Sequence, residues 1–133
     1  MKSASEQGVS TPTSHRDLKV WQIGVDLTET FYRLTATWPK HEQYGLVNQI
    51  RRAAVSVPAN IAEGAGRRTT GEFRHFVGVA RGSLAELETL LLVAHRLGYV
   101  DRPTYESVAA DLFELGRMAT GLLRSLGDKP SPS

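Results

Sequence analysis

Apolar residues recur along most of this chain at intervals of three and four, the spacing of one face of an α-helix. Four stretches show this pattern, at about 17–37, 44–65, 69–98 and 101–126, and none shows the alternation typical of a β-strand. Long amphipathic helices joined by short connections are typical of an antiparallel bundle with up-down-up-down topology. The predicted fold is therefore all-α, an antiparallel four-helix bundle.

The first predicted helix is apolar over a wide arc. One series of apolar positions includes Leu27 and Phe31, and a second series beside it includes Trp21 and Tyr32. A helix with so wide an apolar surface contacts more than one neighbour. The helix should end at Trp38, because a proline follows and disfavours the α conformation of the preceding residue.

The second predicted helix contains Pro58. A proline in a helix interior removes a backbone hydrogen bond and costs roughly 3 kcal/mol, so local rules would split the helix and let Ser56 cap its second half. The apolar register nevertheless continues from Val47 and Ile50 to Ile61. We therefore predict a single helix that is kinked at Pro58.

The third and fourth helices carry recognisable end signals. Thr69 and Glu72 have the spacing of a capping box, in which each side chain accepts a hydrogen bond from the other residue's backbone N–H. Gly98 is a suitable C-terminal cap for the third helix. The fourth should begin at Asp101, with Pro103 in its first turn.

Two glycines, Gly78 and Gly82, lie inside the third predicted helix, where each costs about 1 kcal/mol relative to alanine. The pair predicts close approach of another backbone, either within the bundle or across a subunit interface. A tolerated pair of glycines is the alternative.

Composition limits the remaining possibilities. The polar segments 1–16 and 127–133 are predicted to be disordered tails on either side of one domain, 17–126. The chain has no cysteine, which excludes disulfides, thiolate catalysis and the common structural zinc sites. It has no apolar run as long as a signal peptide or a membrane span, so we expect a cytoplasmic protein without a membrane partner.

Three motifs carry a family resemblance. They are IRRAAVSVPANIAEG at 50–64, GSLAELE at 82–88 and DLKVW at 17–21. Together they resemble the 23S rRNA-intervening sequence family of bacterial four-helix-bundle proteins, and the likeness extends over about 17–126.

The resemblance has functional implications. It implies a proline inside a continuous second helix and a homo-oligomer that is a ring of five subunits. Some members are encoded within insertions in ribosomal RNA genes, and the related accessory variability determinants of diversity-generating retroelements bind nucleic acid and a reverse transcriptase. No enzymatic activity is established for the family in general.

The sequence offers little for catalysis or metal binding. Glu72 and His75 form a Glu-x-x-His pair, the spacing found in di-iron bundles, but those sites need a second pair and two further carboxylates. We see no combination of acid, base and nucleophile. We therefore predict no metal, no cofactor and no enzymatic activity. An enzyme ranks third among the functional hypotheses, after the two that are given at the end of this section.

Polar residues crowd the two longer motifs. They would form either a functional polar site or interhelical ion pairs and hydrogen bonds that fix helix register, and we favour the structural role. The residues are Arg51, Arg52, Asn60, Glu63, Glu86 and Glu88.

Basic residues gather at one end of the predicted bundle, where the first helix starts, the second and third are connected, and the fourth ends. Seven basic residues face four acidic ones there, an excess of three positive charges. For a single subunit, an ordinary solvated face is the alternative. Repeated around a ring, this end would form a positive rim suited to a polyanion. The basic set is Arg16, Lys19, Arg67, Arg68, Arg74, Arg124 and Lys129, and the acidic set is Asp17, Glu63, Glu72 and Asp128.

The leading hypothesis is a homo-oligomeric, pentameric scaffold that holds RNA or DNA by its phosphates with little base specificity. Part of the subunit interface would come from Trp21 and Tyr32 on the first helix. The alternative is a protein-interaction adaptor of the same fold, whose partner is an enzyme encoded nearby. The predicted nucleic-acid contacts are Lys19, Arg67, Arg68, Arg74 and Arg124.

Overall fold

The computed structural model describes residues 14–127 of the 133. This part contains four α-helices, two short 3-10 helices and no strand, so the predicted all-α class is confirmed. The predicted tails lie largely outside the described residues, although η1 includes His15 and Arg16, which the sequence assigned to the N-terminal tail. The elements are η1 (His15–Asp17), α2 (Lys19–Thr35), η2 (Lys40–Glu42), α3 (Leu46–Ala65), α4 (Thr70–Arg96) and α5 (Arg102–Ser125).

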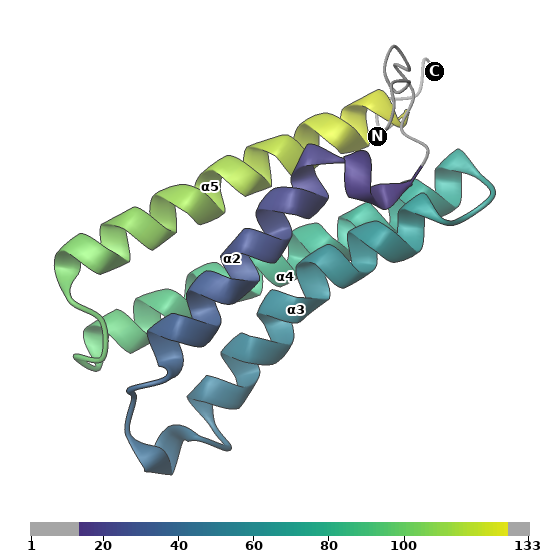
Figure 1. Ribbon diagram of the computed structural model, residues 1–133. Coiled ribbons are helices and arrows are strands. Elements are labelled where there is room, and N and C mark those ends of the chain that lie inside the picture. The colour runs from purple at the N-terminus through teal and green to yellow at the C-terminus, as the bar shows by residue number, and fades with distance from the viewer. Residues whose placement is uncertain (1–13, 128–133) are drawn as a thin grey trace, which may run out of the picture.

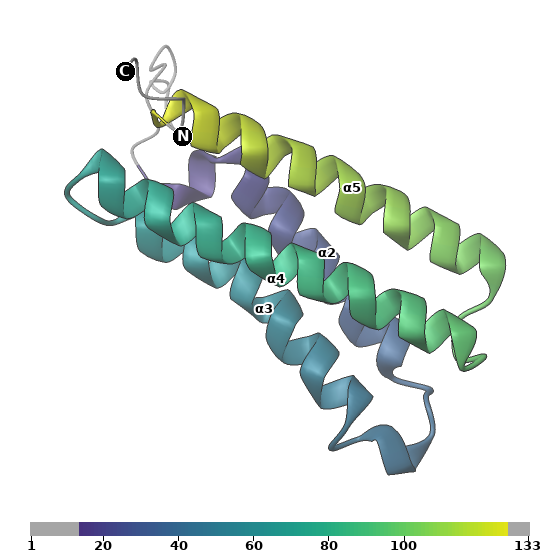
Figure 2. The same cartoon turned by 180° about the vertical axis from the view of Figure 1, so that it is seen from behind.

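The helices form an antiparallel bundle in which sequence neighbours are also neighbours in space. Helix α3 packs against both α2 and α4, α4 packs against α5, and a smaller contact between α5 and α2 closes the bundle. Figure 1 shows the start of α2, the connection between α3 and α4, and the end of α5 together at one end. Seen from behind, α4 and α5 run side by side on the face turned away from the α2–α3 pair (Figure 2).

The core consists of the predicted apolar stripes. Each α-helix contributes a side chain that is almost completely buried, such as Phe31 from α2, Ile50 from α3, Leu87 from α4 and Leu115 from α5. Burying a large aliphatic or aromatic side chain contributes about 1.5–3 kcal/mol. The three-and-four spacing predicted for the stretch 69–98 is confirmed in α4, because its buried residues are Val77, Ala80, Leu84, Leu87, Leu91 and Ala94.

The predicted end signals of the helices are present. The Thr69 hydroxyl accepts a hydrogen bond from the Glu72 backbone N–H at 3.1 Å, and the Glu72 carboxylate accepts one from the Thr69 backbone N–H at 3.3 Å. After α4, Gly98 adopts a φ of +86°, a conformation that glycine takes without steric cost. Asp101 caps α5 by accepting from the Thr104 backbone N–H at 2.9 Å.

Helix α3 runs without a break through Pro58, as predicted from its apolar register. The proline is buried against α2, where a Cβ added to Gly24 would lie 3.5 Å from the Pro58 Cβ. This distance is an ordinary van der Waals contact, so α2 and α3 pack closely at this level and still leave room for a methyl group at Gly24.

The glycine pair of α4 behaves differently. A Cβ added to Gly78 or Gly82 would meet nothing within 4 Å, so no other backbone of the described chain approaches either position. The prediction that another helix of the bundle approaches this glycine pair is wrong. Two explanations of the pair remain: a close contact with a second subunit, or two glycines that the helix tolerates. Within the described residues, no helix is long and apolar enough to cross a membrane.

Candidate nucleic-acid interface

The end of the bundle where α3 and α4 are connected collects basic side chains from four elements. Among residues 14–127, six basic side chains face three acidic ones there, an excess of three positive charges. Lys129 and Asp128, which were assigned to this end, lie outside the described residues. The basic residues are Arg16 and Lys19 near the start of α2, Arg67 and Arg68 in the α3–α4 connection, Arg74 in α4 and Arg124 in α5.

Two of these arginines already have partners within the chain. Arg67 donates to the Glu63 carboxylate at 2.5 Å, and its guanidinium lies 4.9 Å from the ring centre of Phe76. Arg74 donates to the backbone carbonyl of Gly127 at 3.1 Å, which joins α4 to the chain just after α5. Both side chains therefore hold the end of the bundle together as well as adding charge.

Lys19, Arg68 and Arg124 are exposed and make no hydrogen bond or ion pair with any residue in 14–127. A guanidinium without a carboxylate partner keeps all of its donors available for phosphate oxygens. These three are therefore better placed to bind a phosphate than Arg67 or Arg74. The sequence could not rank the five, because the partners of a long side chain depend on the packing around it.

The polar residues of the two longer motifs do not form one network. Arg51 donates from Nε to the Thr35 hydroxyl at 2.9 Å and lies over the Tyr32 ring at 4.5 Å, which ties α3 to α2. The Asn60 amide donates to the Ser56 hydroxyl at 2.9 Å. Each of these contacts involves a residue outside the predicted set.

The remaining members of that set are also apart. Glu63 pairs with Arg67, whereas Arg52, Glu86 and Glu88 are exposed and form no ion pair with any residue of 14–127. Arg52 and Glu86 line a shallow polar pocket between α3 and α4. No two of the six residues form an ion pair or a hydrogen bond with each other in the described chain, although Arg51 makes interhelical hydrogen bonds to Thr35 and Tyr32 of α2.

The two predicted interface residues differ in exposure. Tyr32 is 42% exposed, and Val55 of α3, which is 43% exposed, lines the same shallow pocket. Trp21 is half-buried against the core, and its ring lies 4.9 Å from that of His15. The exposed apolar surface here is limited to Tyr32 and Val55, because the other residues that line the pocket are polar. Sequence reasoning missed Val55, which lies off the apolar stripe of α3.

Glu72 and His75 do not belong to a larger cluster of possible metal ligands within residues 14–127. Glu72 is engaged in the capping box with Thr69, so its carboxylate already accepts hydrogen bonds. Within the described part of the chain, no group of three or more His, Asp or Glu side chains is arranged to hold a metal ion.

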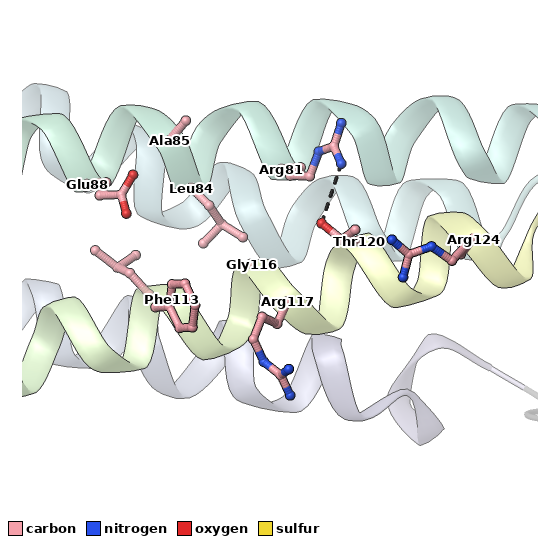
Figure 3. A pocket seen from close by; sticks show the side chains of 10 residues that line it. Arg81, Leu84, Ala85, Glu88, Phe113, Gly116, Arg117, Thr120 and Arg124 are labelled. Carbon is pink, nitrogen blue, oxygen red and sulfur yellow. Dashed lines mark hydrogen bonds between the residues drawn. The ribbon is translucent and has the colours of Figure 1, made fainter. Parts of the chain in front are cut away.

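A groove between α4 and α5 was not predicted. Its volume is about 450 Å³, its floor includes Leu84 and Leu112, and Phe113 beside it is 64% exposed. Arg81 and Arg124 lie toward one end of the groove and Glu88 and Phe113 toward the other (Figure 3). The sequence signal was an aromatic residue beside the apolar stripe of the fourth helix, which does not by itself reveal a groove.

Comparison with known protein families gives a match over residues 16–121, to the family described as 23S rRNA-intervening sequence protein. The chain belongs to the 23S rRNA-intervening sequence protein family. The match covers the whole bundle except the last turn of α5, so the resemblance of the three motifs is confirmed.

A solved structure supports the same fold. It is a protein of unknown function from the S23 ribosomal protein family of Bacteroides thetaiotaomicron, and it is 22% identical to this chain with a TM-score of 0.74. The similarity covers 79% of this chain and 95% of the other. No protein of curated function gives a significant match. This chain, a member of the 23S rRNA-intervening sequence protein family, thus has the same fold as that solved structure.

Proposed function

We propose that this protein is a non-enzymatic, homo-oligomeric scaffold of the cytoplasm, a pentamer, that binds RNA or DNA by phosphate contacts at its basic end. The observation that carries the proposal is the excess of three positive charges at the end where α3 and α4 are connected. Arginine suits this role because its planar guanidinium can donate two parallel hydrogen bonds to a phosphate.

The contacts would come from side chains of different elements. Arg68 lies in the connection between α3 and α4, Lys19 in the first turn of α2 and Arg124 in the last turn of α5. Because these three have no partner in 14–127, they would make the primary contacts, while Arg67 and Arg74 would add to the local potential. Contacts of this kind position a nucleic acid and carry little sequence information.

Fluorescence anisotropy would test the proposal with a structured RNA and a duplex DNA at roughly 50 and 200 mM salt. The variant Arg67→Ala/Arg68→Ala removes two charges from the basic end. Its matched control, Arg33→Ala/Arg96→Ala, removes two exposed charges from the last turns of α2 and α4, at the opposite end.

We expect wild-type binding that weakens steeply with salt. The basic-end variant should bind more weakly and with a reduced salt dependence, because each lost phosphate contact lowers the slope by about 1. The control should resemble the wild type. An equal loss of affinity in both double variants would contradict a binding site at the basic end, because it would show that binding depends only on the net charge of the protein. No binding by the assembled protein at low salt would contradict the proposal and favour a protein-interaction adaptor.

A further inference from the structure

The groove between α4 and α5 combines features that suit a nucleotide. Phe113 presents an exposed aromatic ring, and Arg81 and Arg124 present positive charge beside the same groove. Arg81 donates to the Thr120 hydroxyl at 3.4 Å, which bridges the two helices over the groove (Figure 3). We propose that this groove binds an unpaired nucleotide of a single-stranded nucleic acid, with its base stacked on Phe113 and its phosphate on Arg81 and Arg124. The proposal rests on the proposed nucleic-acid binding and deepens it.

The groove continues the basic end. Arg124 belongs to both, and a shallow hollow lined by Arg74, Gly78 and Arg81 joins the first turns of α4 to the groove. Arg74 and Arg81 are seven residues apart on one helix, so they lie on the same face about 10 Å from each other. A strand held at the basic end could therefore enter the groove over a continuous row of cations.

The charges also give the groove a direction. Glu88 follows Arg81 by another seven residues, so its carboxylate lies about 10 Å further along α4, near Phe113 (Figure 3). A carboxylate repels a phosphate, which therefore belongs at the end where Arg81 and Arg124 lie. The uncharged base belongs at the Phe113 end. Arg117 also lines the groove, but its side chain extends from α5 away from α4 and contacts Glu114 at 3.4 Å, so we do not assign it to the phosphate.

The groove has room for this occupant. Its volume of about 450 Å³ lies within the range of small-molecule sites. A Cβ added to Gly116 on its α5 side would meet nothing within 4 Å, so the backbone is open to a ligand there. An exposed aromatic ring favours a single strand over a duplex, because paired bases are already stacked on one another.

The test compares a fluorescein-labelled 12-nucleotide single strand with the duplex of the same sequence, by anisotropy at several salt concentrations. Phe113→Ala removes the ring, Phe113→Tyr keeps an aromatic face, and Phe113→Leu keeps apolar bulk without one. Val93→Ala is the control, because Val93 is exposed on α4 and does not line the groove. Light scattering on each variant reports its assembly.

We expect Phe113→Ala and Phe113→Leu to weaken single-strand binding about 5- to 100-fold, the effect of losing one stacked base, with the salt dependence unchanged. Phe113→Tyr and Val93→Ala should bind normally, and duplex binding should not change. Arg81→Ala should instead reduce the salt slope for the single strand by about 1.

Three results would overturn the proposal. If Phe113→Ala binds the single strand as the wild type does, while Arg67→Ala/Arg68→Ala loses binding, the basic end functions without the groove. If Phe113→Ala lowers the mass of the assembly, the groove is a contact between subunits. If the wild type binds neither strand nor duplex at low salt, the proposed function itself fails, and a partner protein becomes the better candidate for the groove.

Discussion

The hydroxyl of Thr28 in α2 lies 3.0 Å from the backbone carbonyl oxygen of Ala54 in α3. Ala54 precedes Pro58 by four residues, so its carbonyl would normally accept the N–H that a proline lacks. Thr28 supplies the missing donor from the neighbouring helix. Its hydroxyl has a single proton and also lies 2.9 Å from the Gly24 carbonyl oxygen, so the two carbonyls share this donor. This contact explains how α3 remains one helix across a proline at a buried position.

Replacing Thr28 by valine should therefore destabilise the bundle by about 1–2 kcal/mol, because it leaves the Ala54 carbonyl without a donor. The loss should be smaller when Pro58 is also replaced by alanine, whose N–H can donate to the same carbonyl. Urea denaturation of the four proteins in a double-mutant cycle measures the coupling. Additive effects of the two substitutions would show that Thr28 does not compensate for the proline.

The same glycine-to-alanine change should have opposite effects at two positions. At Gly64 the new Cβ would lie 2.9 Å from the Phe76 Cβ and 3.1 Å from the Phe73 carbonyl oxygen. Crowding of this kind costs about 1–3 kcal/mol, and we expect it to exceed the helix-propensity gain of about 1 kcal/mol. Gly64→Ala should lower the Tm.

Gly82→Ala adds a methyl group where nothing lies within 4 Å, so only the propensity gain remains. It should stabilise the protein by about 1 kcal/mol, without changing the mass of the assembly. Thermal denaturation and light scattering check both expectations. A lower mass for Gly82→Ala would place a second subunit against this face of α4.

At the end of the bundle opposite the basic residues, the Tyr99 hydroxyl donates to the Glu42 carboxylate at 2.8 Å. This hydrogen bond and a second one from the Leu46 backbone N–H lower the pKa of Glu42 below its usual 4.5, and the first also raises the pKa of Tyr99. For Glu42, the stabilisation is fully present above pH 4.5 and is lost as the pH falls through the lowered pKa.

Tyr99→Phe removes the hydroxyl but keeps a ring against Trp38, which lies 5.4 Å from the Tyr99 ring. We expect the Tm of this variant to fall at pH 7, and the difference from the wild type to narrow at acidic pH values below the lowered pKa of Glu42, where its carboxylate becomes protonated. Glu42→Gln should show the same convergence. A difference that stays constant between these pH values would mean that Tyr99 acts through packing alone.

The different exposure of Tyr32 and Trp21 predicts different consequences of mutation. Tyr32→Glu places a charge on the apolar surface that Tyr32 forms with Val55, and should yield smaller assemblies with an unchanged helical CD spectrum. Trp21→Ala removes a half-buried ring from the core and should mainly lower the Tm. Light scattering and thermal melts separate the two effects. If the Tyr32→Glu assembly has the same mass as the wild type, the surface of Tyr32 and Val55 is not part of the subunit interface.

Much of the fold could be predicted from the sequence, because its signals are local. The spacing of Val77, Leu84 and Leu91 is the period of an α-helix, and the capping box of Thr69 and Glu72 spans four residues. Each helix end lies within two positions of the stretch predicted for it, although α2 ends at Thr35, three residues before Trp38, where the following proline was expected to end it. The two 3-10 helices were not predicted, since three residues are too few to show a period.

The candidate site could be predicted only in outline. Arg68 and Arg124 share one end of the bundle because of the order and direction of the helices. The apolar pattern predicts that order and that direction. Arg67 pairs with Glu63, whereas Arg68 has no partner in 14–127. This difference depends on side-chain packing, which the periodicity of the sequence does not encode.

The four amphipathic helices and their caps follow from the sequence alone, because each depends on residues within a few turns of one another. The charge at one end also follows from the sequence, because the order and direction of the predicted helices bring distant basic residues to that end. The tertiary structure decided how Thr28 satisfies the Ala54 carbonyl, and where Phe113 and Arg81 flank a groove. Those relationships join residues that are 26 and 32 positions apart in the chain. Their distances are fixed by the way the helices pack, and no local pattern contains that information.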